Sequence, residues 1–172
     1  SDPLADGPVI QRATERALAA GGSLRASLAL VRSVRPAVSA PIVLFSYANP
    51  LMRMGVERFA REASSAGVQG VLALDLPIEE AEDFDRVLAA AGLDTIFLLS
   101  PTTTEERIRK AARLGRGFLY GISRLGVTGA RDRVADGAEA LVRRIRSHTD
   151  LPVALGFGIS RPEHVAEVGT YA

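Results

Sequence analysis

Residues 70–99 read GVLALDLPIEEAEDFDRVLAAAGLDTIFLL, and this stretch decides the fold class. A short apolar run (70–76) precedes an amphipathic run (79–90), and a second apolar run (94–99) follows. Short, nearly continuous apolar runs are typical of strands buried on both faces, and amphipathic runs are typical of helices that cover a sheet. A strand, a helix and a strand in this order predict a right-handed βαβ unit with parallel strands.

The same alternation continues on both sides of this unit. Further apolar runs, which we expect to form strands, lie at 41–47, 117–122 and 152–155. The helical patterns lie at 9–20, 23–34, 55–66, 79–90, 104–114, 135–146 and 161–168. No linker or low-complexity segment interrupts the alternation, so we predict a single partial barrel domain over residues 1–172.

Several helix ends carry their own signals. Thr103 with Glu106, and Ser160 with Glu163, fit the Ser/Thr-x-x-Glu capping box, which predicts a helix start at each threonine or serine. Gly67 stands where the preceding helix should stop, because glycine adopts the left-handed backbone that often ends a helix.

Composition narrows the functional classes. The chain has 172 residues, of which 47% are apolar and 24% charged, and its formal net charge is +1. This balance gives no reason to expect nucleic acid or an anionic membrane as a partner. The chain has no cysteine, and we expect its histidines, His148 and His164, to be surface residues rather than metal ligands. The sequence shows no signal peptide, and no apolar run approaches the roughly 18 residues of a membrane span, so we expect a cytoplasmic protein. Since there is no cysteine and the two histidines are expected at the surface, we expect no metal.

Two α/β architectures compete, an open doubly wound sheet and a closed (β/α)8 TIM barrel. No G-x-G-x-x-G sequence follows the first expected strand, which argues against a dinucleotide-binding sheet. Polar residues at the expected strand ends, namely Asn49, Asp75, Ser100 and Ser123, favour a barrel with its site at the carboxyl ends of the strands. Fewer strands are visible than a barrel requires, so we predict an incomplete barrel.

The first eight residues, SDPLADGP, place Asp2 and Asp6 four positions apart among two prolines and a glycine. Proline fixes a backbone dihedral and glycine frees one, so we expect a shaped loop here. From the residues alone, turn formation and helix capping explain both aspartates better than catalysis does.

Several motifs in this order resemble the tryptophan synthase alpha subunit family. They are SDPLADGP (1–8), YANP (47–50), DLPIEE (75–80), PTT (101–103), SRLGVTGA (123–130) and GFGIS (156–160). The resemblance implies a (β/α)8 barrel of which this chain covers about strand 3 to helix 7, plus the loop after strand 2. On this alignment the chain lacks strands 1, 2 and 8.

The resemblance also implies a reaction. The family cleaves indole-3-glycerol phosphate to indole and glyceraldehyde 3-phosphate, a retro-aldol step of tryptophan biosynthesis. Asp6 matches the catalytic aspartate, which accepts a hydrogen bond from the indole N–H as the ring becomes positive. The glutamate that acts as acid and base belongs to a strand before SDPLADGP and matches no residue here. We therefore expect residues 1–172 alone to be inactive, and we do not assign the role to Glu79 or Glu80.

The substrate contacts follow from the same resemblance. The family's matching positions for binding indole-3-glycerol phosphate are Tyr120, Phe157, Phe45, Leu98 and Thr128, and those for its phosphate are Gly129 and Gly158. From the residues alone, Tyr120 is better explained as a core aromatic, and the other apolar positions have ordinary barrel core as their alternative. GVTG (126–129) is equally well explained as a flexible loop.

A partner is implied as well. The family's alpha subunit docks on a beta subunit that carries pyridoxal phosphate, forming an alpha2beta2 heterotetramer, and Asp2 and Asn49 match its contact surface. This chain itself should carry no cofactor. Two alternatives stay open, a non-catalytic phosphate-binding or interaction remnant of the same fold, and a different phosphosugar barrel enzyme. The joint presence of SDPLADGP and GVTG argues against the latter.

Overall fold

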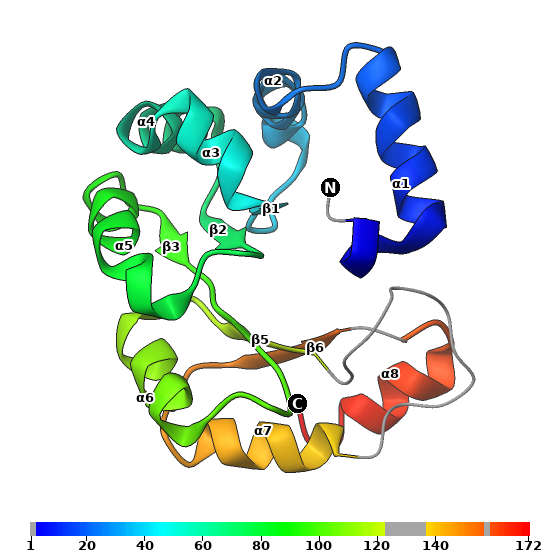
Figure 1. Ribbon diagram of the computed structural model, residues 1–172, viewed down its shortest axis with the longest axis vertical. Helices are drawn as coiled ribbons and strands as arrows, with labels where there is room; N and C mark the ends of the chain where they lie inside the picture. The colour runs from blue at the N-terminus through cyan, green and yellow to red at the C-terminus, as the bar shows by residue number, and fades with distance from the viewer. Residues whose placement is uncertain (1–2, 123–136, 157–158) are drawn as a thin grey trace. The chain divides into compact units, whose positions relative to one another are not determined.

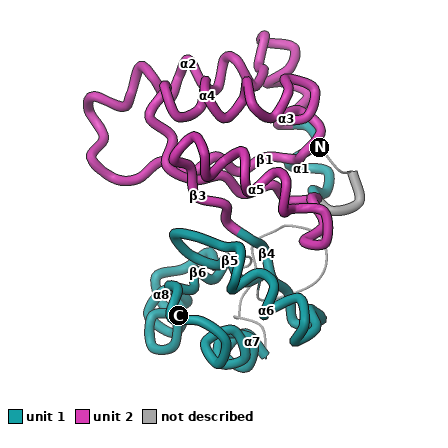
Figure 2. Tube along the Cα trace, turned by 90° about the vertical axis from the view of Figure 1, so that its left-hand side faces the viewer, with its two compact units in different colours: residues 1–12, 97–172 teal, residues 13–96 magenta. Residues whose placement is uncertain are grey.

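The structure, a computed structural model, describes residues 3–122, 137–156 and 159–172, which form helices and parallel strands (Figure 1). The chain divides into two compact units (Figure 2). The first unit comprises Ser1–Arg12 and Phe97–Ala172, and the second comprises Ala13–Ile96. The predicted α/β alternation is confirmed, whereas a single domain over residues 1–172 remains a prediction.

The second unit contains a parallel three-stranded sheet with the order β1-β2-β3. Its elements are α2 (Leu24–Val34), the 3-10 helix η1 (Arg35–Ala37), β1 (Val43–Ser46), α3 (Ala48–Met54), α4 (Val56–Ala66), β2 (Gly70–Ala73), η2 (Ile78–Glu80), α5 (Ala81–Ala90) and β3 (Asp94–Thr95). Helices follow β1 and β2 before the next strand of the sheet begins, as parallel pairing requires.

One face of this sheet carries the core of the second unit. Leu44 and Val71 are register partners and both pack into a cluster with residues of α2, α4 and α5. Successive side chains of a strand point to opposite faces. Phe45 therefore points to the other face, where it is 51% exposed.

A hydrogen-bonded clamp holds the chain that enters β1. The guanidinium of Arg35 donates to the carbonyl of Ala40 (3.0 Å) and to Oε1 of Gln69 (3.3 Å). The same Oε1 accepts from the backbone N–H of Ile42 (2.7 Å). The stem of Arg35 lies against Gly67, which ends α4 with φ 92° as predicted.

The first unit contains a second parallel sheet, with the order β4-β5-β6. Its elements are β4 (Leu98–Leu99), α6 (Glu105–Leu114), β5 (Leu119–Ile122), α7 (Ala138–Arg146), β6 (Val153–Gly156) and α8 (Pro162–Val168). Helix α1 (Pro3–Ala19) begins in this unit.

An ionic cluster ties α7 to the loop after β4. Arg144 donates to Oε1 of Glu105 (2.6 Å) and to the carbonyl of Thr103 (2.6 Å). His148 lies 2.7 Å from the second carboxylate oxygen of Glu105. The hydrogen bonds from His148 and Arg144 lower the pKa of Glu105. The carboxylate therefore stays ionised between the two basic side chains.

Both capping-box predictions are wrong by one residue. Thr104 is the N-cap of α6 and accepts from the N–H of Arg107, while the hydroxyl of Thr103 accepts from the N–H of Ser100 in the turn after β4. Arg161, rather than Ser160, occupies the N-cap of α8. The tertiary course of each incoming loop, which the motif does not encode, decides which residue caps the helix.

The surface prediction is also wrong for His164, which is only 5% exposed. Its Nδ1 accepts from the backbone N–H of Ser160 (3.3 Å), on a face of α8 that also buries Val168. His148 is half-buried against Glu105. A buried polar side chain needs a hydrogen-bond partner, which His164 has, so this residue serves the packing of α8.

Gly67→Ala should destabilise the protein more than Gly92→Ala. Both glycines have positive φ (92° and 73°), so both substitutions should cost about 1 kcal/mol of backbone strain. A Cβ at Gly67 would also overlap the stem of Arg35, whose guanidinium is held by hydrogen bonds, whereas Gly92 has open space. We expect Gly67→Ala to cost at least about 1 kcal/mol more in urea unfolding. Equal losses in the two variants would contradict the clamp.

Candidate functional site

The candidate site in the first unit lies on one face of the β4-β5-β6 sheet. Leu98 pairs in register with Tyr120, which pairs with Ala154, so these side chains share one face. The opposite face is covered by α7, because a Cβ on Gly121 would lie 3.6 Å from Leu141 of that helix. Leu98, Tyr120 and Ala154 therefore form a row that points away from α7, and we call it the inner row.

The ring of Tyr120 covers Gly156, the last residue of β6. A Cβ added at Gly156 would lie 3.1 Å from Cε2 of Tyr120 and would overlap its hydroxyl oxygen. Only glycine leaves room for the ring in this position. Burial raises the pKa of the Tyr120 phenol, so near neutral pH the side chain is a hydroxyl that donates and accepts hydrogen bonds.

Asp6 lies in the same compact unit as the inner row. The predicted loop over residues 1–8 is wrong for the described part, because α1 begins at Pro3. The helix is interrupted at Gly7, whose φ of 71° and ψ of 170° turn the chain between a first helical turn and the long remainder (Figure 1). The half-buried Asp6 precedes this kink directly.

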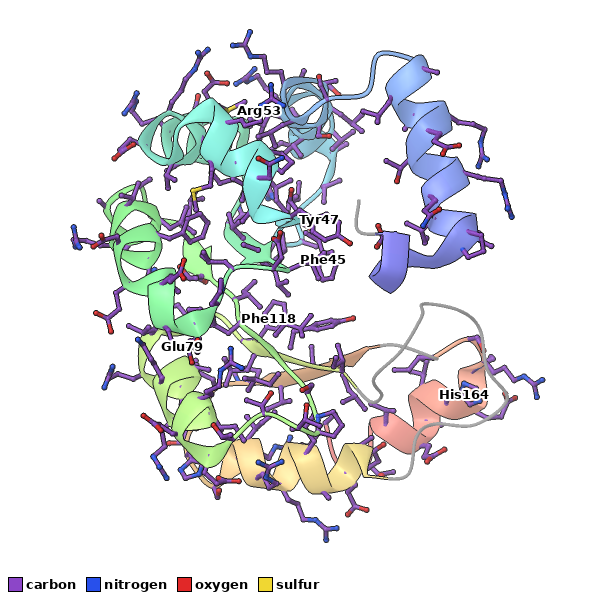
Figure 3. The ribbon with its side chains drawn as sticks, in the orientation of Figure 1. Phe45, Tyr47, Arg53, Glu79, Phe118 and His164 are labelled. Carbon is purple, nitrogen blue, oxygen red and sulfur yellow. The ribbon has the colours of Figure 1, made fainter. Side chains whose placement is uncertain are left out.

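The predicted site residues in the second unit are Phe45 and Asn49. Phe45 lies near the end of β1 with its side chain exposed (Figure 3). The exposed Asn49 lies in the first turn of α3. Five predicted residues, Asp2, Thr128, Gly129, Phe157 and Gly158, fall outside the described residues.

Two residues of interest were missed as site candidates from sequence. Gly156 is the first glycine of a short G-x-G, a signal that does not reveal the ring above it. Asp75 follows β2, and its Oδ1 accepts from the backbone N–H of Ala48 (2.6 Å) at the start of α3. A polar residue directly after a strand is the only sequence signal for this contact.

The described part of the chain offers neither a metal-binding cluster nor a membrane-spanning helix. Residues 3–122, 137–156 and 159–172 contain no group of three or more histidine, aspartate or glutamate side chains that could hold a metal ion. Among these same residues, no helix has the length and apolar character to cross a membrane.

Parallel strands alternate with helices, and apolar and phenolic side chains lie on the strand face that is turned away from a helix. These features define the βα-barrel class of proteins. A profile of the family described as "Tryptophan synthase alpha chain" matches residues 1–172. The chain is 53% identical over 172 residues to the tryptophan synthase alpha chain of Geotalea uraniireducens, and 53% identical to that of Geobacter sulfurreducens. The chain belongs to the tryptophan synthase alpha chain family, which confirms the resemblance.

Solved structures agree with this assignment. The chain is similar to Mycobacterium tuberculosis tryptophan synthase, with a TM-score of 0.90 and 39% identity over 100% of this chain and 65% of the other. It is also similar to a chain of the tryptophan synthase a2b2 complex of Pyrococcus furiosus, with a TM-score of 0.89 and 37% identity over 99% and 68% of the two chains. The fold is an incomplete (β/α)8 barrel, as predicted. The chain spans 64% of the length of the Geotalea relative and 65% of the Geobacter relative.

Gly156→Ala should displace the ring of Tyr120 and lower the pKa of its phenol. The pKa is raised by burial in the wild type, and a ring pushed toward water should titrate closer to the ordinary value of about 10. Because the folded-state pKa is raised above the unfolded-state pKa, the contribution of this group to stability is fully present below the unfolded-state pKa. It is lost as pH rises through the folded-state pKa. Ultraviolet absorbance during alkaline titration measures the change, and Tyr120→Phe assigns it among the three tyrosines. An unchanged titration in Gly156→Ala would show that the ring does not depend on the glycine.

Proposed function

We propose that this chain supplies part of the active site that cleaves indole-3-glycerol phosphate to indole and glyceraldehyde 3-phosphate. The observation that carries the proposal is the inner row, where the phenol of Tyr120 stands beside Leu98 and over Gly156. An apolar surface with one hydroxyl suits a flat indole ring that has a polar glycerol chain. Membership of the family supports the same reaction.

Asp6 has the central chemical role in this proposal. When C3 of the indole is protonated, positive charge spreads over the ring to its nitrogen. A carboxylate that accepts a hydrogen bond from the indole N–H stabilises this charge as it develops. The position of Asp6 beside the Gly7 kink, in the same compact unit as Tyr120, supports the role.

The remaining contacts divide by chemistry. Phe45, Leu98, Tyr120 and Phe157 are proposed to hold the ring, and Thr128 to lie near Asp6 when the loop over the substrate closes. Gly129 and Gly158 are proposed to bring backbone N–H groups close to the phosphate, since glycine allows such an approach.

Proton transfer requires a further group. The C–C bond breaks when C3 gains a proton and the glycerol hydroxyl loses one, which yields indole and an aldehyde. None of the glutamates in residues 1–172 lies in the sequence motif of the family's acid–base residue. We therefore propose that catalysis needs a longer chain than these residues.

We also propose a protein partner. A structural relative is described as belonging to a tryptophan synthase a2b2 complex, and we propose that Asp2 and Asn49 take part in docking on a beta chain. Pyridoxal phosphate chemistry is then assigned to that beta chain, and this chain is expected to act in the cytoplasm without a cofactor of its own.

Asp6→Asn should reduce the turnover of the catalytically competent chain by about 10²–10³, because a neutral amide is left opposite the developing charge. Substrate affinity should change much less, since the charge appears only in the transition state. Indole release at varied substrate concentration separates kcat from KM. A variant with Glu15→Gln, which removes an exposed carboxylate from the same helix, serves as the control. Turnover near the wild-type rate in Asp6→Asn would contradict the role of Asp6.

A polypeptide of residues 1–172 should release no measurable indole, whereas the chain expressed from its complete reading frame should. General acid–base catalysis contributes about 10²–10⁴-fold, and residues 1–172 offer no group in the matching motif. Equal indole release by both would show that a residue within 1–172 transfers the proton. No release by either, with phosphate still bound, would favour the non-catalytic phosphate-binding alternative.

A further inference from the structure

Two of the sequence motifs, YANP (47–50) and DLPIEE (75–80), have no role in the proposed chemistry. The structure joins them by a hydrogen bond within the second unit. Oδ1 of Asp75 accepts from the backbone N–H of Ala48 at 2.6 Å, across 27 residues of sequence. Asp75 follows β2 and Ala48 begins α3, so a side chain links the exits of two neighbouring strands.

The bond continues the strand ladder after the backbones have separated. The last register pair of β1 and β2 is Ser46 with Ala73, and the carbonyl of Ser46 accepts from the N–H of Leu74 (2.9 Å). In a parallel ladder the next bond would run from the N–H of Ala48 to the carbonyl of Leu74. The carboxylate of Asp75 takes the place of that carbonyl. Strand β1 can therefore turn into a helix here without losing this hydrogen bond.

Helix α3 needs such support from outside. Its N-cap residue, Tyr47, makes no side-chain capping hydrogen bond. Pro50 has no N–H to offer. A carboxylate at the first N–H of a helix satisfies an unpaired donor and interacts favourably with the helix dipole. Asp75 is thus an N-terminal cap supplied by another strand.

We propose that Asp75 is a positioning residue that fixes the start of α3 and, through it, the orientation of Asn49 on the docking surface for the beta chain. Asn49 is the neighbour of Ala48 in the first turn and is exposed, so its direction follows the backbone that Asp75 holds. This role rests on the docking surface under Proposed function. It assigns Asp75 of the DLPIEE motif to partner binding rather than to the chemical step.

The first test measures the hydrogen bond itself, on the protein expressed from its complete reading frame. Asp75→Ala should accelerate amide hydrogen exchange at Ala48 by about 10-fold, which corresponds to about 1.4 kcal/mol. Asp75→Asn keeps an oxygen acceptor and should restore most of the protection. Glu80→Ala, which removes another exposed carboxylate of the same motif, should leave Ala48 unchanged. Unchanged exchange in Asp75→Ala would overturn the proposal.

Ala48→Pro tests the same bond from the donor side. Proline is well suited to the first position of a helix, and Tyr47 already has the extended backbone (φ −74°, ψ 154°) that precedes proline. The substitution removes the N–H and leaves Asp75 in place. In an Ala48→Pro background, Asp75→Ala should cause no further loss of beta-chain affinity. A full additional loss would show that Asp75 acts by another contact and would overturn the proposal.

The second test measures affinity for the beta chain of the same organism by calorimetry. Asp75→Ala and Asn49→Ala should each weaken binding by about 5–10-fold, while Asp75→Asn and Glu80→Ala should stay near the wild type. Weaker binding in Asn49→Ala with wild-type affinity in Asp75→Ala would overturn the positioning role alone. If Asp75→Ala accelerates exchange at Ala48 but Asn49→Ala and Asp75→Ala both bind the beta chain like the wild type, the proposed docking surface would be overturned. The positioning role that rests on this surface would then be overturned with it.

Discussion

The alternation of side chains along parallel strands is the constraint on which the rest of this structure depends. In the second unit it sends Leu44 and Val71 into the helix-covered core and leaves Phe45 on the other face. In the first unit it sets Leu98 and Tyr120 on the face turned away from α7. Because the helices occupy one face of each sheet, the side chains that we propose as substrate contacts come from the opposite face and from the strand ends. A shift of register by one residue would exchange the two sets.

Much of this arrangement could be predicted from the sequence, because the spacing of apolar residues and the length of each apolar or amphipathic run are local properties of the sequence. The apolar run at 70–76 becomes β2, although the strand ends at Ala73. The shortening has a physical cause, since Leu74 still donates to Ser46 and the side chain of Asp75 then replaces the backbone as acceptor. A prediction from residue type assigns Leu74 and Leu76 to the strand, because the sequence of this segment does not show where β1 turns away from β2.

The errors share a different cause. Thr103 and Thr104 offer the same hydroxyl, and only the turn at Ser100, which uses the first of them, leaves the second to cap α6. His164 is buried because α8 turns that side inward, and a single histidine gives no sign of its orientation. Gly156 was missed for the same reason, because its importance lies in a ring that comes from another strand. Tyr120 and Leu98 were predicted from the family resemblance, and the register adds that they are direct neighbours.

The central claim is that the inner row is the surface against which the indole ring lies. It is tested most directly by methyl NMR of the protein from its complete reading frame, titrated with indole. Adjacent residues provide internal controls, since Leu98 and Ala154 lie on the inner row while Leu99 and Leu155 point to the opposite face. Indole should shift the methyl signals of Leu98 and Ala154 in a saturable manner and leave those of Leu99 and Leu155 nearly unchanged. Shifts confined to Leu99 and Leu155, or equal on both faces, would contradict the assignment of this face to the substrate.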